Sequence, residues 1–512
     1  MGLLSGTGAA RTGPALREGS MYKPTYQRIC VIGNGYVGSV VSACLAHVGH
    51  EVVGVEEDAA RLEQLRNGVA PFHEPGLEPL LRSSMREGRL RFVHELDVAM
   101  DESDVVFVCV GTPSGADGLP DMTAMARAAR MIAVNLRHYH VLVTKSTVPI
   151  GTGRWLASVI EDQLGGYGSG KGLFSVVANP EFLREGTAVN DYLHPERVVL
   201  GSDDPGALQI VADVYRPILD QVVPGDTTAR EQVPLVKTNL ATGEMSKYAS
   251  NAFLATKISF ANEIARLCDF VGADVNEVTA VMGLDSRIGS RFLGAGLGWG
   301  GSCFGKDLKA LVSTAIEYGY HPRILAASLA VNDSQRQFVV DELLRELRTL
   351  RGARVCVLGL AFKGGTDDLR DSPGLDIATR LARRSAFVTA YDPMVECLPN
   401  QSELRLYPDA YAAASGADAI VVATDWPDFA TIDLRNLRDA MHGNVFFDGR
   451  NLFDPQRVRR AGFRYLAVGR PRAGLEHSLT VELMPAPTSV PAINGDRSLL
   501  AATAPPFGGP TT

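Results

Sequence analysis

Short apolar runs and longer amphipathic segments alternate along the first part of the chain. The apolar runs between Arg28 and Phe182 read RICVIG, EVVGVEE, DVVFVCVGTP, HVLVTKSTVP and FSVVANPEF, and segments such as SVVSACLAHVGH lie between them. Apolar runs of this length predict buried strands, and the amphipathic segments predict helices. Because strands separated by helices pair in parallel, the pattern predicts an α/β domain with helices on both faces of a parallel sheet.

The pattern changes near the middle of the chain and then returns. From about Pro234 to Leu350 the segments are mostly helical, and one of them reads EMSKYASNAFLATKISFANEIARLCDFVG. Strand-like runs come back at RVCVLGLAF, AFVTAYDP, DAIVVATDW and NVFFDGR. We therefore predict the α/β fold class, with two Rossmann-like parallel-sheet domains joined by a long-helix connector domain.

Five segments follow from this division. The two ends of the chain are rich in small and polar residues and lack hydrophobic periodicity, which predicts disordered tails. The predicted segments are an N-terminal tail at 1–27, a first α/β domain at 28–228, a helical connector at 229–345, a second α/β domain at 346–470 and a C-terminal tail at 471–512.

Composition narrows the class of protein. The chain has 512 residues, 46% of them hydrophobic, and its 50 Lys and Arg against 58 Asp and Glu give a net charge of −8, which argues against a general nucleic-acid binder. No apolar run approaches the ~18–20 residues of a membrane span, and the N-terminus has no signal pattern. Seven scattered cysteines without a CxxC pair argue against a disulfide framework and a zinc site. We expect a cytoplasmic protein that binds no metal, nucleic acid or membrane.

A glycine-rich turn follows the first predicted strand. Residues 33–38 read GNGYVG, which is the GxGxxG spacing between a strand and a helix. Gly33 permits the tight turn, Gly35 lets the backbone approach a pyrophosphate, and Gly38 lets the helix pack closely on the strand. The free N–H groups of the helix N-terminus then face the phosphates. This turn predicts a dinucleotide site.

The end of the second strand selects between the two nicotinamide dinucleotides. Glu56 lies 56 − 33 = 23 residues after the first glycine of the turn, where a carboxylate accepts both ribose hydroxyls. It also repels a 2′-phosphate, and Glu57 and Asp58 add to that repulsion. Arg61 flanks the adenine ribose without reversing the preference. We therefore predict NAD as the cofactor.

A candidate nucleophile lies in the segment GLGWGGSCFGKD. Cys303 comes directly after two glycines and a serine, and Lys306 and Asp307 follow three and four residues later. If a helix begins here, Cys303 lies at its positive end, where a thiolate is stabilised. A thiol in such a place is a candidate for covalent catalysis.

Two further segments carry candidate chemistry. Lys247 and Asn251 are four residues apart on a predicted helix, so both can donate hydrogen bonds to one developing oxyanion; a solvated helix face is the alternative. The loop NPEFLREG carries Glu181 and Glu185, and the strand end KSTVP carries Thr147. Both follow parallel strands, whose carboxyl ends form the ligand-binding edge of such sheets.

These motifs together resemble one enzyme family. GNGYVG, EPGL, CVGTP, STVP, NPEFLREG, EMSKYASNAFLATKISFANE, GGSCFGKD, GLAFKGGTDDLRDSP, YDP and DGRN occur in the order found in nucleotide-sugar dehydrogenases. The chain resembles the UDP-glucose/GDP-mannose dehydrogenase family from about Arg28 to Arg470.

The resemblance implies an oxidation in two steps at C6 of a sugar nucleotide. It implies that UDP-glucose is oxidised to UDP-glucuronate by NAD, through a thiohemiacetal and a thioester on Cys303, with two NADH per turnover. By the same resemblance Lys247 and Asn251 stabilise oxyanions, and Asp307 takes part in proton removal with Lys247 or an ordered water. Glu185 resembles the residue assigned to thioester hydrolysis, with Glu181 and Thr147 organising water nearby.

The resemblance also implies two binding sites and a homodimer. The positions implied for the cofactor are Gly33, Gly35, Tyr36, Val37, Gly38, Glu56, Arg61, Thr112, Thr147, Glu185, Lys306 and Arg370. The positions implied for the nucleotide sugar are Glu181, Phe182, Leu183, Lys247, Asn251, Arg287, Phe292, Trp299, Gly300, Phe362, Lys363 and Arg450. The second α/β domain keeps Gly359 but lacks GxGxxG, so it is expected to bind the UDP part. Arg287 is expected to reach the site of the partner subunit in a dimer built on the long helices.

Some positions depart from the family pattern. Glu56 stands where Asp is commoner, Gly305 replaces a frequent Pro, and Trp299 stands where Phe is usual. Gly364 and Gly365 loosen the loop after the expected sugar-nucleotide lysine. Because the Trp adjoins the expected sugar pocket, the choice of hexose stays open.

Three alternatives follow from these points. The same chemistry on GDP-mannose or UDP-N-acetylmannosamine is the first, although Ser302 lies where the N-acetyl-sugar enzymes typically have His. A two-electron hydroxyacid dehydrogenase is the second, and it needs no Cys303. A non-catalytic protein that binds NAD or a nucleotide sugar is the third, and it would tolerate loss of Cys303, Lys247 and Asp307.

Overall fold

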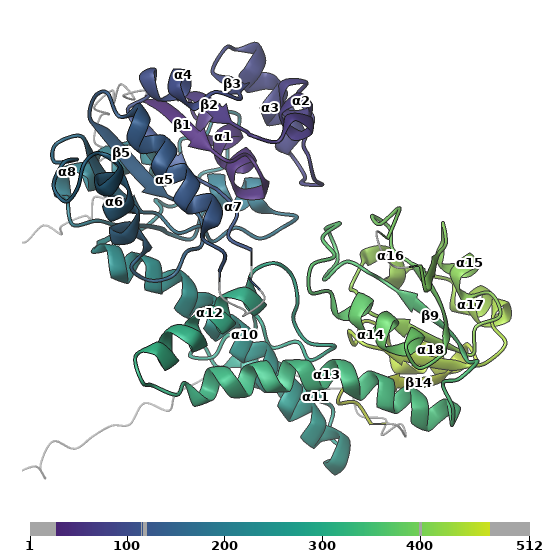
Figure 1. Ribbon diagram of the computed structural model, residues 1–512. Helices are drawn as coiled ribbons and strands as arrows, with labels where there is room; N and C mark the ends of the chain where they lie inside the picture. The colour runs from purple at the N-terminus through teal and green to yellow at the C-terminus, as the bar shows by residue number, and fades with distance from the viewer. Residues whose placement is uncertain (1–26, 114, 116–119, 399–401, 472–512) are drawn as a thin grey trace, which may run out of the picture. The chain divides into compact units, whose positions relative to one another are not determined.

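The structure is a computed structural model that describes residues 27–113, 115, 120–398 and 402–471 (Figure 1). Apart from Gln27 and Pro471, the two tails predicted to be disordered lie outside the described residues. Among the described residues, no helix combines the length and apolar character needed to cross a membrane.

The first sheet has eight strands in the order β3-β2-β1-β4-β5-β6-β7-β8. Neighbouring strands pair in parallel except β6 and β7, which run antiparallel through the pair Ala178 and Gly201. The strands are β1 (Arg28–Ile32), β2 (Glu51–Val55), β3 (Leu90–Val93), β4 (Val105–Val108), β5 (His140–Thr144), β6 (Phe174–Ala178), β7 (Val198–Gly201) and β8 (Leu235–Thr238).

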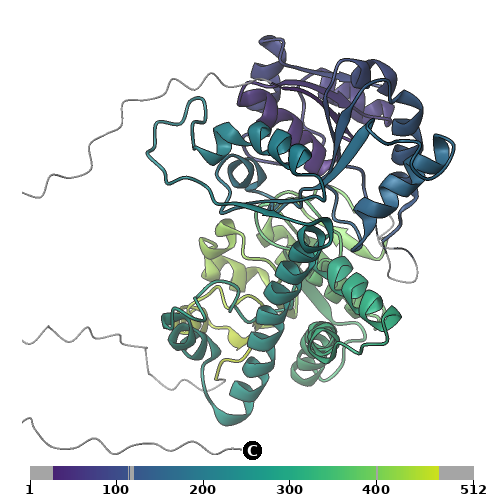
Figure 2. The ribbon, with the colours of Figure 1, turned by 90° about the vertical axis from the view of Figure 1, so that its left-hand side faces the viewer.

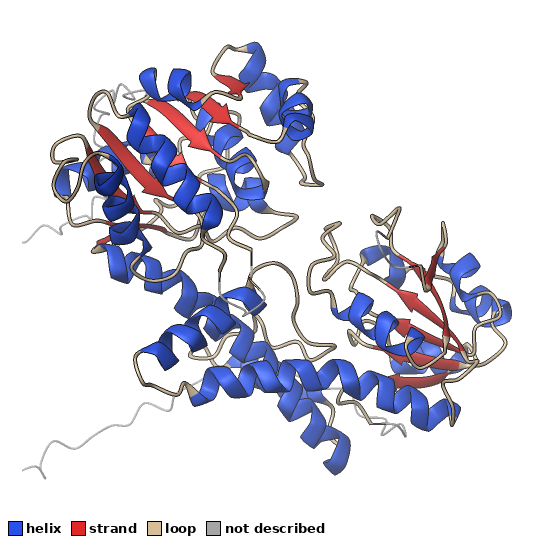
Figure 3. Ribbon diagram, in the orientation of Figure 1, coloured by secondary structure: helices blue, strands red, loops and turns tan. Residues whose placement is uncertain are grey.

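Helices cover both faces of this sheet, as the sequence predicts (Figure 3). Along β1 the side chains alternate: Ile29 and Val31 lie in one hydrophobic cluster with α1, while Cys30 and Ile32 lie in another with α5. The helices are α1 (Tyr36–His47), α2 (Ala59–Arg66), α3 (Leu77–Arg86), α4 (Leu96–Asp101), α5 (Thr123–Asn135), α6 (Thr152–Gln163), α7 (Ala188–Leu193), α8 (Pro205–Val214) and α9 (Arg216–Leu219).

The central part of the chain is mostly helical. Its helices are α10 (Leu240–Val271), α11 (Val275–Leu284), α12 (Phe304–Glu317) and α13 (Arg323–Leu347). The 32-residue α10 is one continuous helix, capped by the Asn239 side chain at its start and by Gly272 in the left-handed region (φ 77°) at its end (Figure 2). The stretch predicted to be mostly helical begins with one short strand, β8, which pairs with β7. The predicted domain boundaries stay predictions.

The second sheet has six strands, all paired in parallel, in the order β11-β10-β9-β12-β13-β14. They are β9 (Arg354–Leu358), β10 (Phe387–Tyr391), β11 (Leu404–Leu406), β12 (Ala419–Val422), β13 (Val445–Asp448) and β14 (Arg464–Ala467). The helices are α14 (Pro373–Ala382), α15 (Ala410–Ala414), α16 (Pro427–Ala430), α17 (Leu434–Ala440) and α18 (Pro455–Arg460). The two α/β domains and the helical connector agree with the predicted fold class.

Candidate active site

The glycine turn joins β1 to α1, and the space beside Gly35 in this turn is open. Gly33 has a φ of 84°, and its N–H donates to Val55 O at 2.9 Å. A Cβ at Gly38 would lie 1.9 Å from the Gly33 carbonyl oxygen, so only glycine fits there. A Cβ at Gly35 would meet nothing within 4 Å, and the N-terminus of α1 has no side-chain cap. The turn therefore leaves room and free N–H donors for a pyrophosphate.

Glu56 lies directly after β2 and is buried. Its carboxylate accepts the backbone N–H of Asn34 at 2.9 Å and that of Asp58 at 3.0 Å. The guanidinium of Arg61 lies 3.3 Å from both of its oxygens. Glu56 thus holds the glycine turn in place as well as presenting a negative charge at the expected ribose position. This second role does not follow from the motif.

Cys303 lies at the N-cap position of α12, as the sequence predicts. A Cβ at Gly300 would lie 2.2 Å from Asp371 O, and Gly301 has a φ of 84°, so both glycines are required by the turn. The Ser302 hydroxyl oxygen lies 3.5 Å from the Cys303 sulfur. The thiol is therefore held at the start of a helix by a tightly packed loop.

Two buried ionic contacts lie close to the thiol. The Lys247 ammonium lies 2.7 Å from a Glu181 carboxylate oxygen. Asp307 is completely buried; it accepts the Asn251 amide N–H at 2.7 Å and lies 2.9 Å from the Lys306 ammonium. The structure thus brings together side chains from α10, α12 and the loop after β6.

The electrostatics keep the lysine and its partner charged but the thiol neutral. Burial alone lowers the pKa of Lys247, but Glu181, Cys303 and Asp307 raise it above its ordinary value. Burial alone raises the pKa of Glu181, but Lys247 outweighs it and holds that pKa below its ordinary value. The pKa of Cys303 is raised, chiefly by burial and further by Glu181 and Asp307, although Lys247 opposes them. The sequence predicts a stabilised thiolate here; burial and two carboxylates favour the thiol instead.

Glu185 connects the loop after β6 with the Cys303 loop and with the second α/β domain. Its carboxylate accepts the Ser302 hydroxyl at 3.1 Å and lies 3.4 Å from the Arg370 guanidinium. The Lys363 ammonium donates to its backbone carbonyl at 2.6 Å. Burial first and then the charge of Asp368 raise the pKa of Glu185 to about 7, and Arg370 limits the rise.

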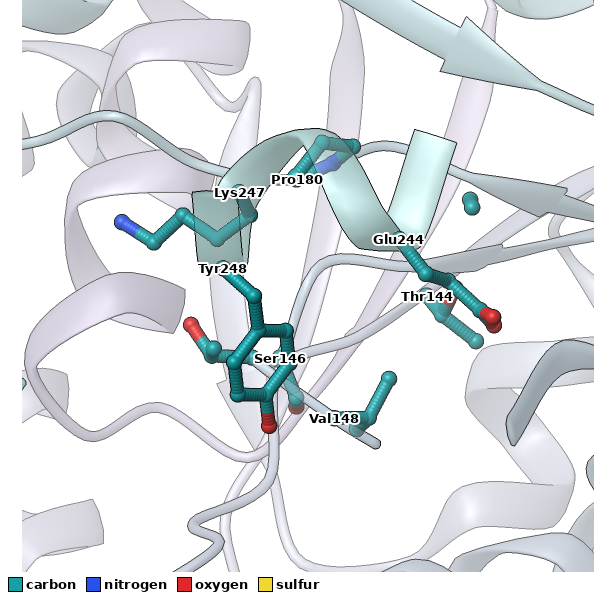
Figure 4. Close-up of a pocket in the computed structure, with 9 residues that line it drawn as sticks. Thr144, Ser146, Val148, Pro180, Glu244, Lys247 and Tyr248 are labelled. Carbon is teal, nitrogen blue, oxygen red and sulfur yellow. The ribbon is translucent and has the colours of Figure 1, made fainter. Parts of the chain in front are cut away.

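Thr147 lies beside a small cavity on the same sheet edge. The cavity is lined by Thr144, Ser146, Thr147, Val148, Ala178, Pro180, Glu244, Lys247 and Tyr248 (Figure 4). The Thr112 hydroxyl donates to the Thr147 carbonyl oxygen at 2.8 Å. The cavity therefore adjoins Lys247 on one side and the strand end KSTVP on the other.

Comparison with protein families matches three stretches of the chain. Residues 27–219 match the NAD binding domain, 241–334 the central domain and 356–455 the UDP binding domain of one family. The chain belongs to the UDP-glucose/GDP-mannose dehydrogenase family. It is therefore an oxidoreductase, an NAD-dependent nucleotide-sugar dehydrogenase.

Individual relatives cover nearly the whole described chain. The UDP-glucose 6-dehydrogenase TuaD of Bacillus subtilis is 42% identical over 450 residues, which are 87% of this chain and 94% of the relative. A UDP-glucose 6-dehydrogenase of Rhizobium meliloti is 43% identical over 452 residues, 87% of this chain and 100% of the relative. The structure of a UDP-glucose dehydrogenase from Pyrobaculum islandicum superimposes with a TM-score of 0.79 at 36% identity, covering 90% of this chain and 100% of that one.

The residues of the first domain fit NAD. The open side of Gly35, the uncapped N-terminus of α1 and the buried Glu56 supply the space, the N–H donors and the carboxylate that a dinucleotide with a free 2′-hydroxyl needs. The described residues contain no group of three or more side chains arranged to hold a metal ion.

The predicted sugar-nucleotide residues fall into two groups. In the first group, the Phe182 ring contacts two cations, with the Arg197 guanidinium 3.8 Å and the Lys247 ammonium 5.5 Å from its centre. The Leu183 N–H donates to a Glu181 carboxylate oxygen. Arg450 is held by the carbonyl oxygens of Ala423, Phe362 and Gly298.

Other predicted positions lie at the edge of this cluster or away from it. The Trp299 ring is buried and packs edge-on against Phe304, and its N–H donates to Ser259. The Phe292 ring lies 6.4 Å from that of Phe304. Within one chain, Arg287 is not brought to the site: its side chain is 88% exposed and pairs with Asp285.

One positioning carboxylate is missing from the predicted residues. Glu74, in the EPGL motif, is buried and accepts the Tyr36 hydroxyl at 2.5 Å and the backbone N–H groups of Gly186 and Ala188 at 2.8 and 2.7 Å. It therefore joins the dinucleotide turn to the Glu185 loop. An acidic residue before Pro-Gly was the available signal, but its two backbone partners, Gly186 and Ala188, lie more than a hundred residues away.

Replacing Glu185 with glutamine is expected to remove a pH dependence of stability. A carboxyl with an ordinary pKa of 4.5 and a pKa of about 7 in the folded protein stabilises the fold below pH 4.5, and this contribution is lost as the pH rises through 7. The variant should match the wild type near pH 4.5 and exceed its free energy of unfolding by about 2–3 kcal/mol at pH 8. Urea unfolding at both pH values measures this. Equal curves for the variant, the wild type and the exposed control Glu231→Gln would contradict it.

Proposed function

We propose that this protein oxidises UDP-glucose to UDP-glucuronate in two successive two-electron steps. NAD, when bound, accepts one hydride in each step. The observation that carries the proposal is a thiol at the start of α12, beside two buried pairs, Lys247 with Glu181 and Asn251 with Asp307. A simple alcohol dehydrogenase has no use for such a thiol, whereas an enzyme that continues past the aldehyde must hold that aldehyde.

In the proposed mechanism Cys303 retains the intermediate. Its sulfur bonds to the aldehyde carbon and the thiol proton passes to the aldehyde oxygen, which gives a thiohemiacetal. Because the surroundings favour the thiol, a neighbouring group must take this proton first, and the buried Asp307 is the proposed acceptor. Lys247 and Asn251 donate hydrogen bonds to the oxygen as its charge develops.

The thioester left by the second oxidation is hydrolysed by water. The water oxygen bonds to the carbonyl carbon and the carbon–sulfur bond breaks. The products are the carboxylate and the free thiol, and one proton is released. Glu185 is the proposed base, since a pKa of about 7 lets it accept and return a proton near neutral pH. Glu181 and Thr147 are proposed to orient the water.

The substrate class is proposed from the relatives. Two relatives that are 42% and 43% identical over 87% of this chain are UDP-glucose 6-dehydrogenases. Lys363 and Arg450 are proposed to bind the diphosphate, because cations suit it and both are partly buried among backbone carbonyls. Trp299 is proposed to border the hexose.

A panel of nucleotide sugars tests this proposal. We expect NADH formation with UDP-glucose at a rate at least tenfold above that with GDP-mannose or UDP-N-acetylmannosamine, with about two NADH for each UDP-glucose consumed. Absorbance at the NADH band, together with chromatography of the acid, measures both numbers. Rapid turnover of GDP-mannose with none of UDP-glucose would exclude the proposed substrate, and one NADH per sugar would exclude the proposed mechanism.

The proposed homodimer rests on one face of α10. Phe253, Phe260 and Leu267 are spaced seven residues apart, so they share a face, and they are 66%, 47% and 54% exposed in a single chain. Exposed aromatic residues in a row are typical of a covered interface. The proposed dimer would bring Arg287 of one subunit to the site of its partner.

The double variant Phe253→Glu/Phe260→Glu is expected to be monomeric. Two charges on an apolar face oppose its burial, and the monomer should lose most of its activity because Arg287 no longer reaches a partner. Sedimentation velocity and NADH formation measure the two effects. Tyr167→Glu replaces a still more exposed aromatic residue (98%) in the loop after α6 and should change neither. An unchanged sedimentation coefficient for the double variant would refute this interface.

A further inference from the structure

The cavity beside Lys247 contains a buried hydroxyl without a hydrogen-bond partner. Tyr248 is 2% exposed, and among the described residues its hydroxyl oxygen makes no hydrogen bond. Figure 4 shows its ring extending from α10 toward Ser146 and Val148, while the Lys247 side chain points away from it. A buried hydroxyl left unpaired costs stability, so native proteins generally satisfy such groups with protein atoms or ordered water.

The polar neighbours of Tyr248 are already committed to other partners. Both carboxylate oxygens of Glu244 accept backbone N–H groups at the start of α6, from Gly151 at 2.6 Å and Gly153 at 2.7 Å. The Ser146 hydroxyl donates to Val110 O at 2.7 Å. Each of these groups makes its hydrogen bonds elsewhere, and among the described residues none reaches the Tyr248 hydroxyl, so a small polar molecule in the cavity is a suitable partner for it.

The cavity suits a single water molecule. About 10 Å³ is open to the centre of a water molecule, which is about what one water requires. Burial first, and then the charges of Asp307 and Glu244, raise the pKa of Tyr248, so its hydroxyl keeps its proton and is available as a donor. Thr147 and Lys247 line the same cavity. The Lys247 ammonium lies 2.7 Å from Glu181, so the water would be near the proposed hydrolytic site.

We propose that Tyr248 holds an ordered water in this cavity and that this water is the one consumed when the Cys303 thioester is hydrolysed. The inference rests on the proposed function for its kinetic part. The water oxygen bonds to the thioester carbonyl carbon, the carbon–sulfur bond breaks, the sulfur regains a proton and the second proton leaves through the proposed base Glu185. Tyr248 is a positioning residue in this step, because it touches the water and not the substrate.

The variant Tyr248→Phe tests the water site without relying on activity. If the hydroxyl binds a water, its removal should leave the melting temperature unchanged or lower it; if the hydroxyl is simply unpaired, the melting temperature should rise. A crystal structure of the wild type should show a water within hydrogen-bond distance of the hydroxyl, and the variant should lack it. A raised melting temperature, or an empty cavity in the wild type, overturns the proposal.

The kinetic part is tested by rapid mixing with NAD and UDP-glucose. We expect Tyr248→Phe to form about two NADH per active site in a burst and then to turn over at least tenfold more slowly than the wild type, with the thioester adduct on Cys303 detected by intact mass. Tyr465→Phe is the matched control, because its buried hydroxyl donates to Asp448 at 3.0 Å in the second domain; it should lower the melting temperature without a burst.

The outcomes separate this inference from the proposed function. If the wild type turns over UDP-glucose but Tyr248→Phe shows neither a burst nor slower turnover, the role of Tyr248 is contradicted and the proposed function is not. A wild type that forms no NADH from UDP-glucose contradicts the proposed function, while the melting temperatures and the crystal structure still decide whether the water site exists.

Discussion

Replacing Cys303 with serine is expected to abolish formation of the acid while leaving NAD binding nearly intact. A serine hydroxyl is a far weaker nucleophile than a thiol, so the aldehyde cannot be held for the second oxidation. The loss in turnover should be about a thousandfold or more, the scale found when a covalent nucleophile is removed. NAD binding should persist because the glycine turn and Glu56 follow β1 and β2, whereas the Cys303 sulfur lies beside Ser302 at the start of α12.

Two measurements and one control decide this prediction. Steady-state NADH formation with chromatography of the product gives the loss of acid, and titration calorimetry gives the affinity for NAD. Cys397→Ser alters the exposed cysteine of the second domain and should be fully active. Retained acid formation in the Cys303 variant would rule out the covalent mechanism, and loss of NAD binding would mean that the variant is misfolded.

Replacing Lys247 with methionine is expected to cost both activity and stability. The ammonium lies 2.7 Å from a Glu181 oxygen and both side chains are buried, so the change leaves a carboxylate in the interior without its cation. Removing one partner of a buried pair typically costs about 3–5 kcal/mol. Turnover should fall by about a hundredfold or more, because a donor to the oxyanion is lost as well.

The stability deficit of Lys247→Met should grow as the pH rises. In the wild type, Lys247 holds the pKa of Glu181 in the folded protein below its ordinary 4.5. The Glu181 carboxylate therefore adds to the free energy of unfolding above pH 4.5, and this addition is lost only as the pH falls through the lowered pKa. Without the lysine, burial raises the pKa of Glu181 above 4.5. The variant then loses stability as the pH rises through that raised value. The two proteins should therefore differ least in acid and most near neutral pH.

A second substitution makes this prediction specific. In Lys247→Met/Glu181→Gln the uncompensated charge is gone, so we expect the free energy of unfolding to recover by about 2 kcal/mol or more relative to the single variant, with activity still lost. Urea unfolding at pH 5 and pH 8 for the wild type, both single variants and the double variant completes the cycle. A deficit that does not depend on pH, or no recovery in the double variant, would contradict the ion pair.

Two strands, β8 and β11, were not predicted because their sequences show little hydrophobic pattern. β11 has three residues, and β8 has only partly buried or exposed positions, so neither shows the apolar run that identifies a strand. β11 pairs with the longer strand β10, and β8 pairs with the fully buried strand β7. These neighbours supply the hydrogen-bond partners that select the extended form. The sheet, and not the local sequence, decides these elements.

The amino-acid sequence by itself determined the features that depend on neighbours along the chain. The glycine turn, the carboxylate at the end of β2, the helix that begins after Cys303 and the two buried sheets all follow from local spacing, because turn geometry, helix capping and the alternation of apolar residues act over a few residues. The order of motifs then identified the family.

Only the tertiary structure decided how the charges of the site are paired. The hydrogen bond between Asn251 and Asp307 joins residues 56 positions apart in the sequence. The hydrogen bond between Ser302 and Glu185 joins residues 117 positions apart, so no local pattern reveals either contact. Burial then set their protonation: it favours a neutral Cys303 and raises the pKa of Glu185, whereas the motif alone predicts a thiolate. Desolvation and charge pairing depend on three-dimensional distance, which is why spacing along the chain could name these residues but not state their charges.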